Sequence, residues 1–276
     1  MAFLNSDQPS ENPVSWLRQK PPFRYVDDVI SLTSDHAVGS LLLIETADRY
    51  IGSDRLARLL FIEAVAQLAG IHVHNRVGPG YRGYLVGIET ATFFPTIHRA
   101  SPVTLVVDPL AETGNVLRYE GAVRQGDTVL CRAVIRTYLQ SGPATLGGAE
   151  RQTIGNKAKV DNTDTPTLFR YFSGDEPYFA GHFPGDPLVP GVVLVDGMVE
   201  AGRKLIGSPG QNAMVFDGPD LVGIEGARFN ALVRPGNGIG FKARLIENSA
   251  SFLTLKCSAF LDRTRCAVAT LRFRSP

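Results

Sequence analysis

The sequence predicts an α+β protein made of two related halves, each with one apolar helix and an antiparallel sheet. The first observation behind this prediction is an internal repeat, because residues 85–93 (LVGIETATF) return as residues 221–229 (LVGIEGARF) with seven of nine positions identical. The second is that each copy has one helix-length apolar segment followed by several runs of strand-forming residues. No further helix-length segment separates those runs, so neighbouring strands are expected to be antiparallel. Two copies indicate a duplicated domain and not a solenoid.

The composition is that of an ordinary globular protein and excludes several classes. The 276 residues include 28 Lys and Arg against 27 Asp and Glu, a formal net charge of +1, which argues against a nucleic-acid-binding protein. No apolar run approaches the roughly 20 residues that a membrane span needs, and the amino terminus does not resemble a signal peptide. The three cysteines, Cys131, Cys257 and Cys266, have no C-x-x-C spacing, which argues against a disulfide framework or a zinc site and favours a cytoplasmic location.

The repeat divides the chain into four parts. Residues 1–20 are polar and are expected to form a flexible lead, and residues 21–140 form the first copy. Residues 141–164 are rich in Gly, Ser, Thr and charge, which is typical of a linker. The second copy spans residues 165–276. Its lead-in is shorter than that of the first copy, so its first strand is either supplied by the linker, around residues 157–160, or missing.

Each copy has a helix that is apolar nearly all round and must therefore be buried on most sides. In the first copy Ser53 is a candidate N-cap for a helix over residues 54–74. In the second, the helix starts after Pro190 and ends near Gly207. The β-branched and alternating runs after the helices predict strands over residues 83–88, 103–107, 116–123 and 128–138, and over 221–224, 239–245, 251–261 and 266–273.

The clearest chemical motif is the stretch EPYFAGHFPGDPLVPGV, residues 176–192, around His182. Its prolines and glycines predict a stiff loop, which positions a side chain at low entropic cost. Histidine, with an unperturbed pKa of about 6.5, is suited to proton transfer at neutral pH. The N–H groups of the helix that follows could polarise an acyl carbonyl. The alternative is that His182 only satisfies backbone groups in a turn.

Acidic residues on the two apolar helices are the second motif. Glu63 and Gln67 in the first copy, and Asp196 and Glu200 in the second, are each spaced i,i+4 and share a helix face. A carboxyl on such a helix is partly desolvated, which raises its pKa and lets it hold a proton for donation. The alternative is a solvent-facing stripe on a half-buried helix.

The second copy resembles the bacterial 3-hydroxyacyl-ACP dehydratases, which have the hotdog fold. The loop around His182 is similar to their catalytic-loop signature. In the first copy, PPFRYVDDVI (residues 21–30) resembles their first strand, and IEAVAQLAG (residues 62–70) resembles their catalytic helix. The resemblance implies a tandem double hotdog. It also implies that a histidine acts on the α-carbon proton, that an acid fourteen positions later handles the leaving hydroxyl, and that the two come from opposite subunits of a dimer.

Applied to this duplicated chain, the cross-subunit rule implies one active site per chain. Aligning the helices at an offset of 133 places Arg49 where the second copy has His182, and arginine stays protonated. We therefore expect His182 as general base and Glu63 as general acid in one composite site. The resemblance assigns the carbonyl-polarising N–H to Gly191, and Gln67 is expected to orient Glu63. The alternative acid is Asp196, acting across a homodimer of second-copy domains.

The function expected from the resemblance is dehydration of a (3R)-3-hydroxyacyl thioester to the trans-2-enoyl thioester, in fatty-acid or polyketide-type synthesis. No metal or redox cofactor is expected, the partner is an acyl carrier protein, and whole chains could form a homo-oligomer. Two alternatives remain: a catalytically lapsed protein that binds acyl chains or scaffolds a partner dehydratase, and an acyl thioesterase. Acyl chain length and a following isomerase step are left open.

Overall fold

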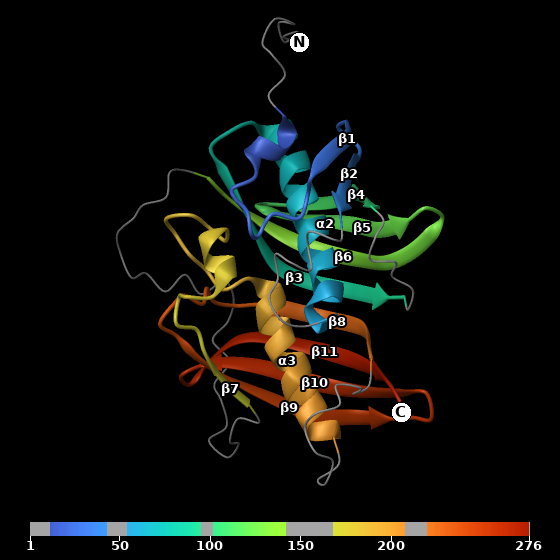
Figure 1. The fold of residues 1–276 in the computed structure, drawn as a ribbon, viewed down its shortest axis with the longest axis vertical. Helices are drawn as coiled ribbons and strands as arrows, with labels where there is room; N and C mark the ends of the chain where they lie inside the picture. Colours follow the sequence, from blue (N-terminus) through green and yellow to red (C-terminus); the bar gives the residue numbers. More distant parts are fainter. Residues whose placement is uncertain (1–11, 43–53, 95–101, 142–167, 208–219, 276) are drawn as a thin grey trace, which may run out of the picture.

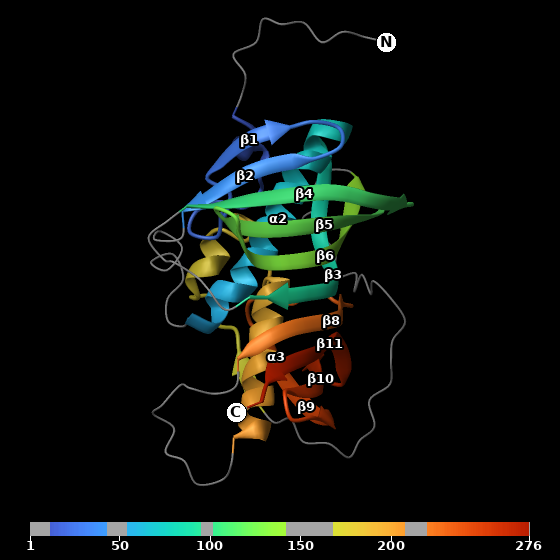
Figure 2. The same ribbon diagram turned by 90° about the vertical axis from the view of Figure 1, so that its right-hand side faces the viewer.

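The structure, a computed structural model of the chain, describes residues 12–42, 54–94, 102–141, 168–207 and 220–275. Within these residues, eleven strands form one sheet in the order β1-β2-β4-β5-β6-β3-β8-β11-β10-β9-β7, and every neighbouring pair is antiparallel. Figures 1 and 2 show the sheet curling around two helices that lie on one of its faces. The double-hotdog α+β architecture predicted from the sequence is confirmed.

The first half of the fold holds the longer helix and six strands. Its elements are the 3-10 helix η1 (Pro13–Trp16), β1 (Asp28–Leu32), β2 (Ala37–Leu42), α2 (Asp54–Val77), β3 (Tyr81–Phe93), β4 (Pro102–Thr113), β5 (Val116–Gln125) and β6 (Thr128–Ser141). The predicted strands are all present and extend further than the sequence pattern indicated. The helix continues to Val77, and its candidate cap, Ser53, lies outside the described residues.

The second half repeats the arrangement with five strands. Its elements are β7 (Leu168–Tyr171), the 3-10 helix η2 (Pro177–Ala180), α3 (Gly191–Ile206), β8 (Leu221–Phe229), β9 (Gly238–Asn248), β10 (Phe252–Leu261) and β11 (Thr264–Arg274). The helix has the predicted bounds, with Pro190 as N-cap and Gly207 as C-cap. The predicted first strand at residues 157–160 and the linker beyond Ser141 lie outside the described residues. Among those described, β7 pairs with the far edge of β9.

The repeated segment joins the two halves at the centre of the sheet. Its two copies are β3 and β8, which pair with each other (Figure 2). The register is two-fold symmetric at this point: Gly87 faces Arg228 and Thr92 faces Gly223, while Ile88 faces Ala227 and Ala91 faces Ile224. The halves therefore meet as two subunits of a dimer would, and one continuous core lies beneath both.

The predicted flexible lead over residues 1–20 is wrong for its described part. Residues 13–16 form η1, capped by the Asn12 side chain, which accepts a hydrogen bond from the Val14 N–H at 3.0 Å. Val14 and Leu17 are buried in the core, and the Trp16 ring stacks on His74 of α2 at 4.6 Å between ring centroids. A few apolar side chains in an otherwise polar stretch are enough to fix it, because each gains a buried partner. No helix in the described ranges is long and apolar enough to cross a membrane.

Candidate active site

A cavity of about 130 Å³ lies between the two halves and holds the residues singled out from the sequence. Its wall comes from residues 16–19, α2, β3 and β6 of the first half. The second half contributes the loop before α3, the start of α3 and residues 229–233. Glu63, Gln67, His182 and Gly191 all line this cavity. An imidazole from the second half and a carboxyl from the first half thus line the same cavity.

His182 lies in the histidine loop (residues 176–190), two residues after the end of η2, which is part of this loop. Its Nδ1 lies 2.9 Å from the Leu188 carbonyl oxygen, and the Leu188 N–H donates to the His182 carbonyl at 2.9 Å. A carbonyl can only accept, so Nδ1 carries the proton and Nε2 of the neutral ring keeps its lone pair. Burial lowers the pKa of His182 to about 4, against the partial opposition of the Leu188 bond, and the charge of Arg18 lowers it further. The ring is therefore a neutral base near pH 7, with a pKa well below the unperturbed value of about 6.5 because the side chain is buried.

Aromatic rings hold the imidazole in place. The ring of Phe183 stacks on it with centroids 4.2 Å apart, and Phe23 of the first half meets its edge at 5.0 Å. Backbone hydrogen bonds from Gly181 and His182 to the Tyr178 carbonyl close the turn in front of it. The loop thus packs around the histidine on several sides. Only Nδ1 of the ring has a described hydrogen-bond partner in the turn, so a purely structural role for His182 would not account for Nε2.

Glu63 lies on α2 and is 4 % exposed. Burial raises the pKa of its carboxyl to about 7, and this effect exceeds the lowering by side-chain hydrogen bonds from Gln67 and Gln19. Desolvation disfavours the charged carboxylate, so a large share of the molecules carry a protonated Glu63 at neutral pH. The expectation of a solvent-facing acidic stripe is wrong for this helix, since Gln67 is also buried.

Gln67 orients the acid. Its Oε1 accepts a hydrogen bond from the Tyr25 N–H at 2.7 Å, and its Nε2 donates to the Phe23 carbonyl at 2.9 Å and to Glu63 Oε1 at 3.0 Å. The two backbone partners fix which end of the amide is nitrogen. Because Gln67 must donate to Oε1, the proton of the neutral Glu63 belongs on Oε2.

Gly191 begins α3 at the cavity wall. The first N–H groups of a helix have no acceptor within it, so they are available to an oxygen in the cavity. The ring of Phe229 lies against the Gly191 Cα so closely that a Cβ there would come within 2.9 Å of it. Glycine is therefore required for the close packing that shapes this corner of the cavity.

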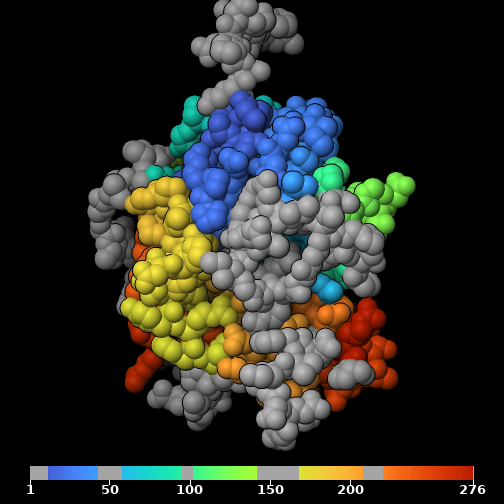
Figure 3. Space-filling view, in the orientation of Figure 1, coloured from blue at the N-terminus to red at the C-terminus, as the bar shows by residue number. Residues whose placement is uncertain are grey.

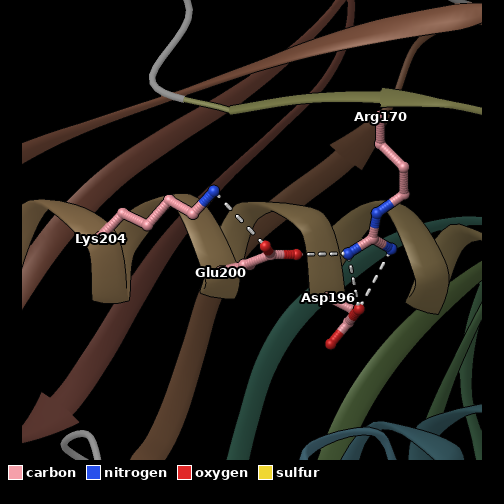
Figure 4. Close-up of polar contacts among 4 residues, drawn as sticks. All are labelled: Arg170, Asp196, Glu200 and Lys204. Atoms are coloured by element: carbon pink, nitrogen blue, oxygen red, sulfur yellow. Dashed lines mark hydrogen bonds and ion pairs between the residues drawn. The ribbon is translucent and has the colours of Figure 1, made fainter. Parts of the chain in front are cut away.

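Asp196, the alternative acid, does not line the cavity. It is buried and accepts hydrogen bonds from Arg170 of β7 through Oδ2 at 3.1 and 3.2 Å (Figure 4). The same guanidinium donates to Glu200 at 2.7 Å, and Lys204 lies 3.7 Å from Glu200. At the position that matches Glu63, the second half therefore has an ion-paired carboxylate. Arg49, which matches His182, lies outside the described residues.

Removing the arginine is expected to destabilise the fold. An Arg170→Met variant leaves two acidic side chains on α3 without their main counter-ion, one of them buried. We expect a loss of about 2–3 kcal/mol in the free energy of unfolding, because breaking a buried ion pair strands a charge and Arg170 is itself partly exposed. Urea denaturation measures it, with Lys204→Met as the control, expected to cost under about 0.5 kcal/mol. Equal losses in both variants would contradict this role for Arg170.

Residues 18 and 19 are site residues that the sequence did not reveal. Both line the cavity, and the Gln19 side chain acts on Glu63. They belong to a polar stretch without a motif, so no local signal distinguishes them from a loop. A further histidine of α2, His72, is buried in the core and not at the cavity, and its ring nitrogens lie 2.9 Å from the Tyr119 hydroxyl and 3.0 Å from the Ser34 carbonyl oxygen.

Comparison with known proteins relates this chain to dehydratases. A family model described as ApeI-like, ApeI dehydratase, matches residues 158–268. The 3-hydroxyacyl-(acyl-carrier-protein) dehydratase FabZ of Petrotoga mobilis is 33% identical over 111 residues, which cover 40% of this chain and 77% of that protein. FabZ of Campylobacter concisus is 33% identical over 105 residues, covering 35% of this chain and 68% of that protein.

Solved structures with low sequence identity share the fold. A 12:0-ACP thioesterase from Umbellularia californica superposes with a TM-score of 0.51 at 13% identity, over 81% of this chain and 89% of that one. An acyl-ACP thioesterase from Bacteroides thetaiotaomicron gives a TM-score of 0.51 at 10% identity, over 78% and 88%. Both align with most of this chain, which supports the tandem hotdog architecture and nothing about the reaction.

Proposed function

The chain belongs to the 3-hydroxyacyl-(acyl-carrier-protein) dehydratase family, and from this premise we propose that it is a hydro-lyase with one composite active site per chain. Its substrate is a (3R)-3-hydroxyacyl thioester on an acyl carrier protein, and its product is the trans-2-enoyl thioester. His182 is the general base and Glu63 the general acid. Asp196 takes no part, because its carboxylate is bound to Arg170.

The proposed reaction uses each group in the protonation state that its surroundings favour. Nε2 of the neutral His182 takes a proton from C2, the electrons of that C–H bond form the C2–C3 double bond, and the C3–O bond breaks. Glu63 gives its proton to the leaving hydroxyl, which departs as water. The Gly191 N–H supports the charge that develops on the thioester oxygen. A proton passed from His182 back to Glu63 restores the starting state.

The main support for this proposal is that the pKa values of His182 and Glu63, which line one cavity, are shifted in opposite directions. Burial keeps the imidazole neutral and favours the protonated carboxyl, so the base can accept a proton and the acid can donate one. A pair of groups whose surroundings push their pKa values apart is a typical acid–base arrangement. A lapsed protein would have no need of this arrangement, and the family relationship of the chain is to dehydratases.

The test is an assay of the purified chain with a 3-hydroxyacyl-ACP. Absorbance of the enoyl thioester, which appears without free thiol, is the expected result. Release of free thiol would indicate a thioesterase, and the absence of both products with short, medium and long chains would indicate a lapsed acyl-binding protein. Either of the last two results overturns the proposal.

The rate is expected to depend on pH in a way that follows from the two shifts. The active form has neutral His182 and protonated Glu63, so it dominates between their pKa values of about 4 and about 7. As pH rises above about 7, Glu63 loses the proton it must donate, and kcat/KM is expected to fall about tenfold per unit. A profile of kcat/KM from pH 5 to 9 measures this. A rate that rises up to pH 9 would contradict the role of a protonated Glu63.

A further inference from the structure

The N-terminal segment, here residues 12–25, connects the catalytic elements of the two halves. The Lys20 N–H donates to the Gly181 carbonyl at 3.0 Å, one residue before His182. A Cβ on Gly181 would collide with the Lys20 carbonyl and come within 2.8 Å of the Phe23 nitrogen, so the two backbones are in direct contact. Figure 3 shows the blue surface of this region lying against the yellow surface of the histidine loop.

On the side of the first half, the same segment contacts α2, the helix that bears Glu63. The Tyr25 N–H and the Phe23 carbonyl hold Gln67, which in turn holds Glu63. Leu17 is buried in the core, and Trp16 stacks on His74 further along α2. One short stretch of chain therefore touches the base from one side and the acid from the other.

The side chain of Arg18 contacts the histidine loop at two residues, Phe183 and Asp186. Its guanidinium carbon lies 4.1 Å from the centroid of the Phe183 ring, and Phe183 in turn stacks on His182 at 4.2 Å. Its Nη2 lies 4.0 Å from Asp186 Oδ2 in the same loop. A planar guanidinium can stack on a ring and pair with a carboxylate at once, and a lysine cannot reproduce both contacts.

The charges around His182 make Arg18 distinct from its neighbours. Asp186 also pairs with Arg82 at 3.7 Å and with Arg234 at 2.7 Å, so two further cations share its charge. Glu63 lines the same cavity as His182, and burial raises the pKa of its carboxyl to about 7. Arg18 is the charged side chain that lowers the pKa of the imidazole, in the same direction as burial.

We propose that Arg18 is a positioning residue for His182: its contacts with Phe183 and Asp186 keep the imidazole in place at the cavity wall. Its charge also disfavours the imidazolium. The proposal rests on the proposed function for its kinetic readout, since the role of His182 as base comes from there. Its structural part, the hold on the imidazole and on the protonation of that ring, concerns the protein alone.

The test compares Arg18→Gln with Arg18→Lys and with the control Arg234→Gln. The control removes the shortest of the three Asp186 ion pairs but leaves the stack of Arg18 on Phe183 intact. Titration of the His182 imidazole by NMR in the substrate-free full chain, and kcat/KM against pH, are measured for each. Thermal unfolding checks that every variant is folded at the assay temperature.

Arg18→Gln is expected to raise the pKa of His182 by about one unit, since it removes a nearby cation, and to lower kcat about tenfold. The acid limb of kcat/KM moves up in pH by the same amount. Arg18→Lys keeps the charge, so the imidazole titrates as in the wild type while kcat falls by a smaller factor. Arg234→Gln is expected to change kcat by less than about twofold and the pKa of His182 by less than about 0.3 unit.

An unchanged imidazole titration in Arg18→Gln, or equal effects in Arg18→Gln and Arg234→Gln, would overturn the proposal. This failure is distinct from that of the proposed function. If the wild type dehydrates no 3-hydroxyacyl-ACP, the function is wrong, whereas the NMR titration still decides whether Arg18 controls His182. If the wild type is active and His182 titrates alike in the wild type and in Arg18→Gln, only the role of Arg18 is wrong.

Discussion

A Glu63→Gln enzyme is expected to dehydrate 3-hydroxyacyl-ACP at least about 100-fold more slowly than the wild type, because general acid catalysis contributes about 10²–10⁴ in rate. Glutamine matches glutamate in shape and can still meet Gln67, so the cavity keeps its form. It has no acidic proton, so the hydroxyl must leave without assistance. Steady-state kinetics at pH 6, below the pKa of about 7 for Glu63, measures the effect where the wild-type acid is protonated.

The matched variant is Asp196→Asn, which makes the same chemical change at the corresponding position of the other helix. Asp196 is bound to Arg170 and lies outside the cavity, so kcat is expected to stay within about threefold of the wild type. The assay is run well below the unfolding temperature, because the loss of an ion pair lowers stability. If dehydration is lost only in Asp196→Asn, the base acts with the acid of another second-half domain, and the composite site is wrong.

The large features of the fold were predictable because they depend on patterns that repeat along the chain. A wholly apolar helix has to be covered on most sides, and alternating runs without intervening helices form antiparallel strands. The duplicated segment at 85–93 and 221–229 pairs with itself at the sheet centre, as its symmetry allows. The exact strand ends were not predictable, since the strands extend past the apolar runs wherever a neighbour offers hydrogen bonds.

The composite site was only partly predictable, for a physical reason. Glu63, Gln67, His182 and Gly191 belong to local motifs, and the cavity brings them together. Contacts between segments distant in sequence left no such pattern. Arg170 is 26 residues before the carboxylate it binds.

The contacts of the N-terminal segment and the burial of His182 are two further features that the sequence did not predict. Arg18 meets a loop more than 160 residues later, at Phe183, in a stretch whose composition resembled a solvated lead. The pKa of about 4 for His182 depends on burial of the side chain, which spacing alone cannot show.

A Gly70→Leu variant is expected to lose activity on long acyl chains, because Gly70 leaves the cavity wide beside α2. Ala66, Gly70 and His74 follow Glu63 on the cavity side of the helix. Gly70 lies seven residues after Glu63, which is about 10 Å along the helix axis. A Cβ at Gly70 would have Leu17 Cδ2 as its nearest neighbour at 4.0 Å, so the space there is open. In the proposed function, this space takes the acyl chain beyond the reacting carbons.

A leucine at position 70 fills that space and leaves the catalytic pair untouched. We expect kcat/KM for a long-chain 3-hydroxyacyl-ACP to fall about 5- to 150-fold, because overpacking a filled cavity costs about 1–3 kcal/mol. The value for 3-hydroxybutanoyl-ACP is expected to change by less than about threefold, since that chain ends before Gly70. Kinetics with the two substrates measures the ratio directly.

The control is Gly70→Ala, whose added Cβ meets no close neighbour. Alanine also favours the helix over glycine by about 1 kcal/mol, so this variant is expected to be slightly more stable and to use both substrates like the wild type. If Gly70→Leu slows the short and long substrates equally, the effect comes from disturbance of Glu63 or of the fold, and the acyl chain does not run along α2. A selective loss of the long chain, together with an active alanine variant, instead places the chain between the small residues of α2 and the N-terminal segment.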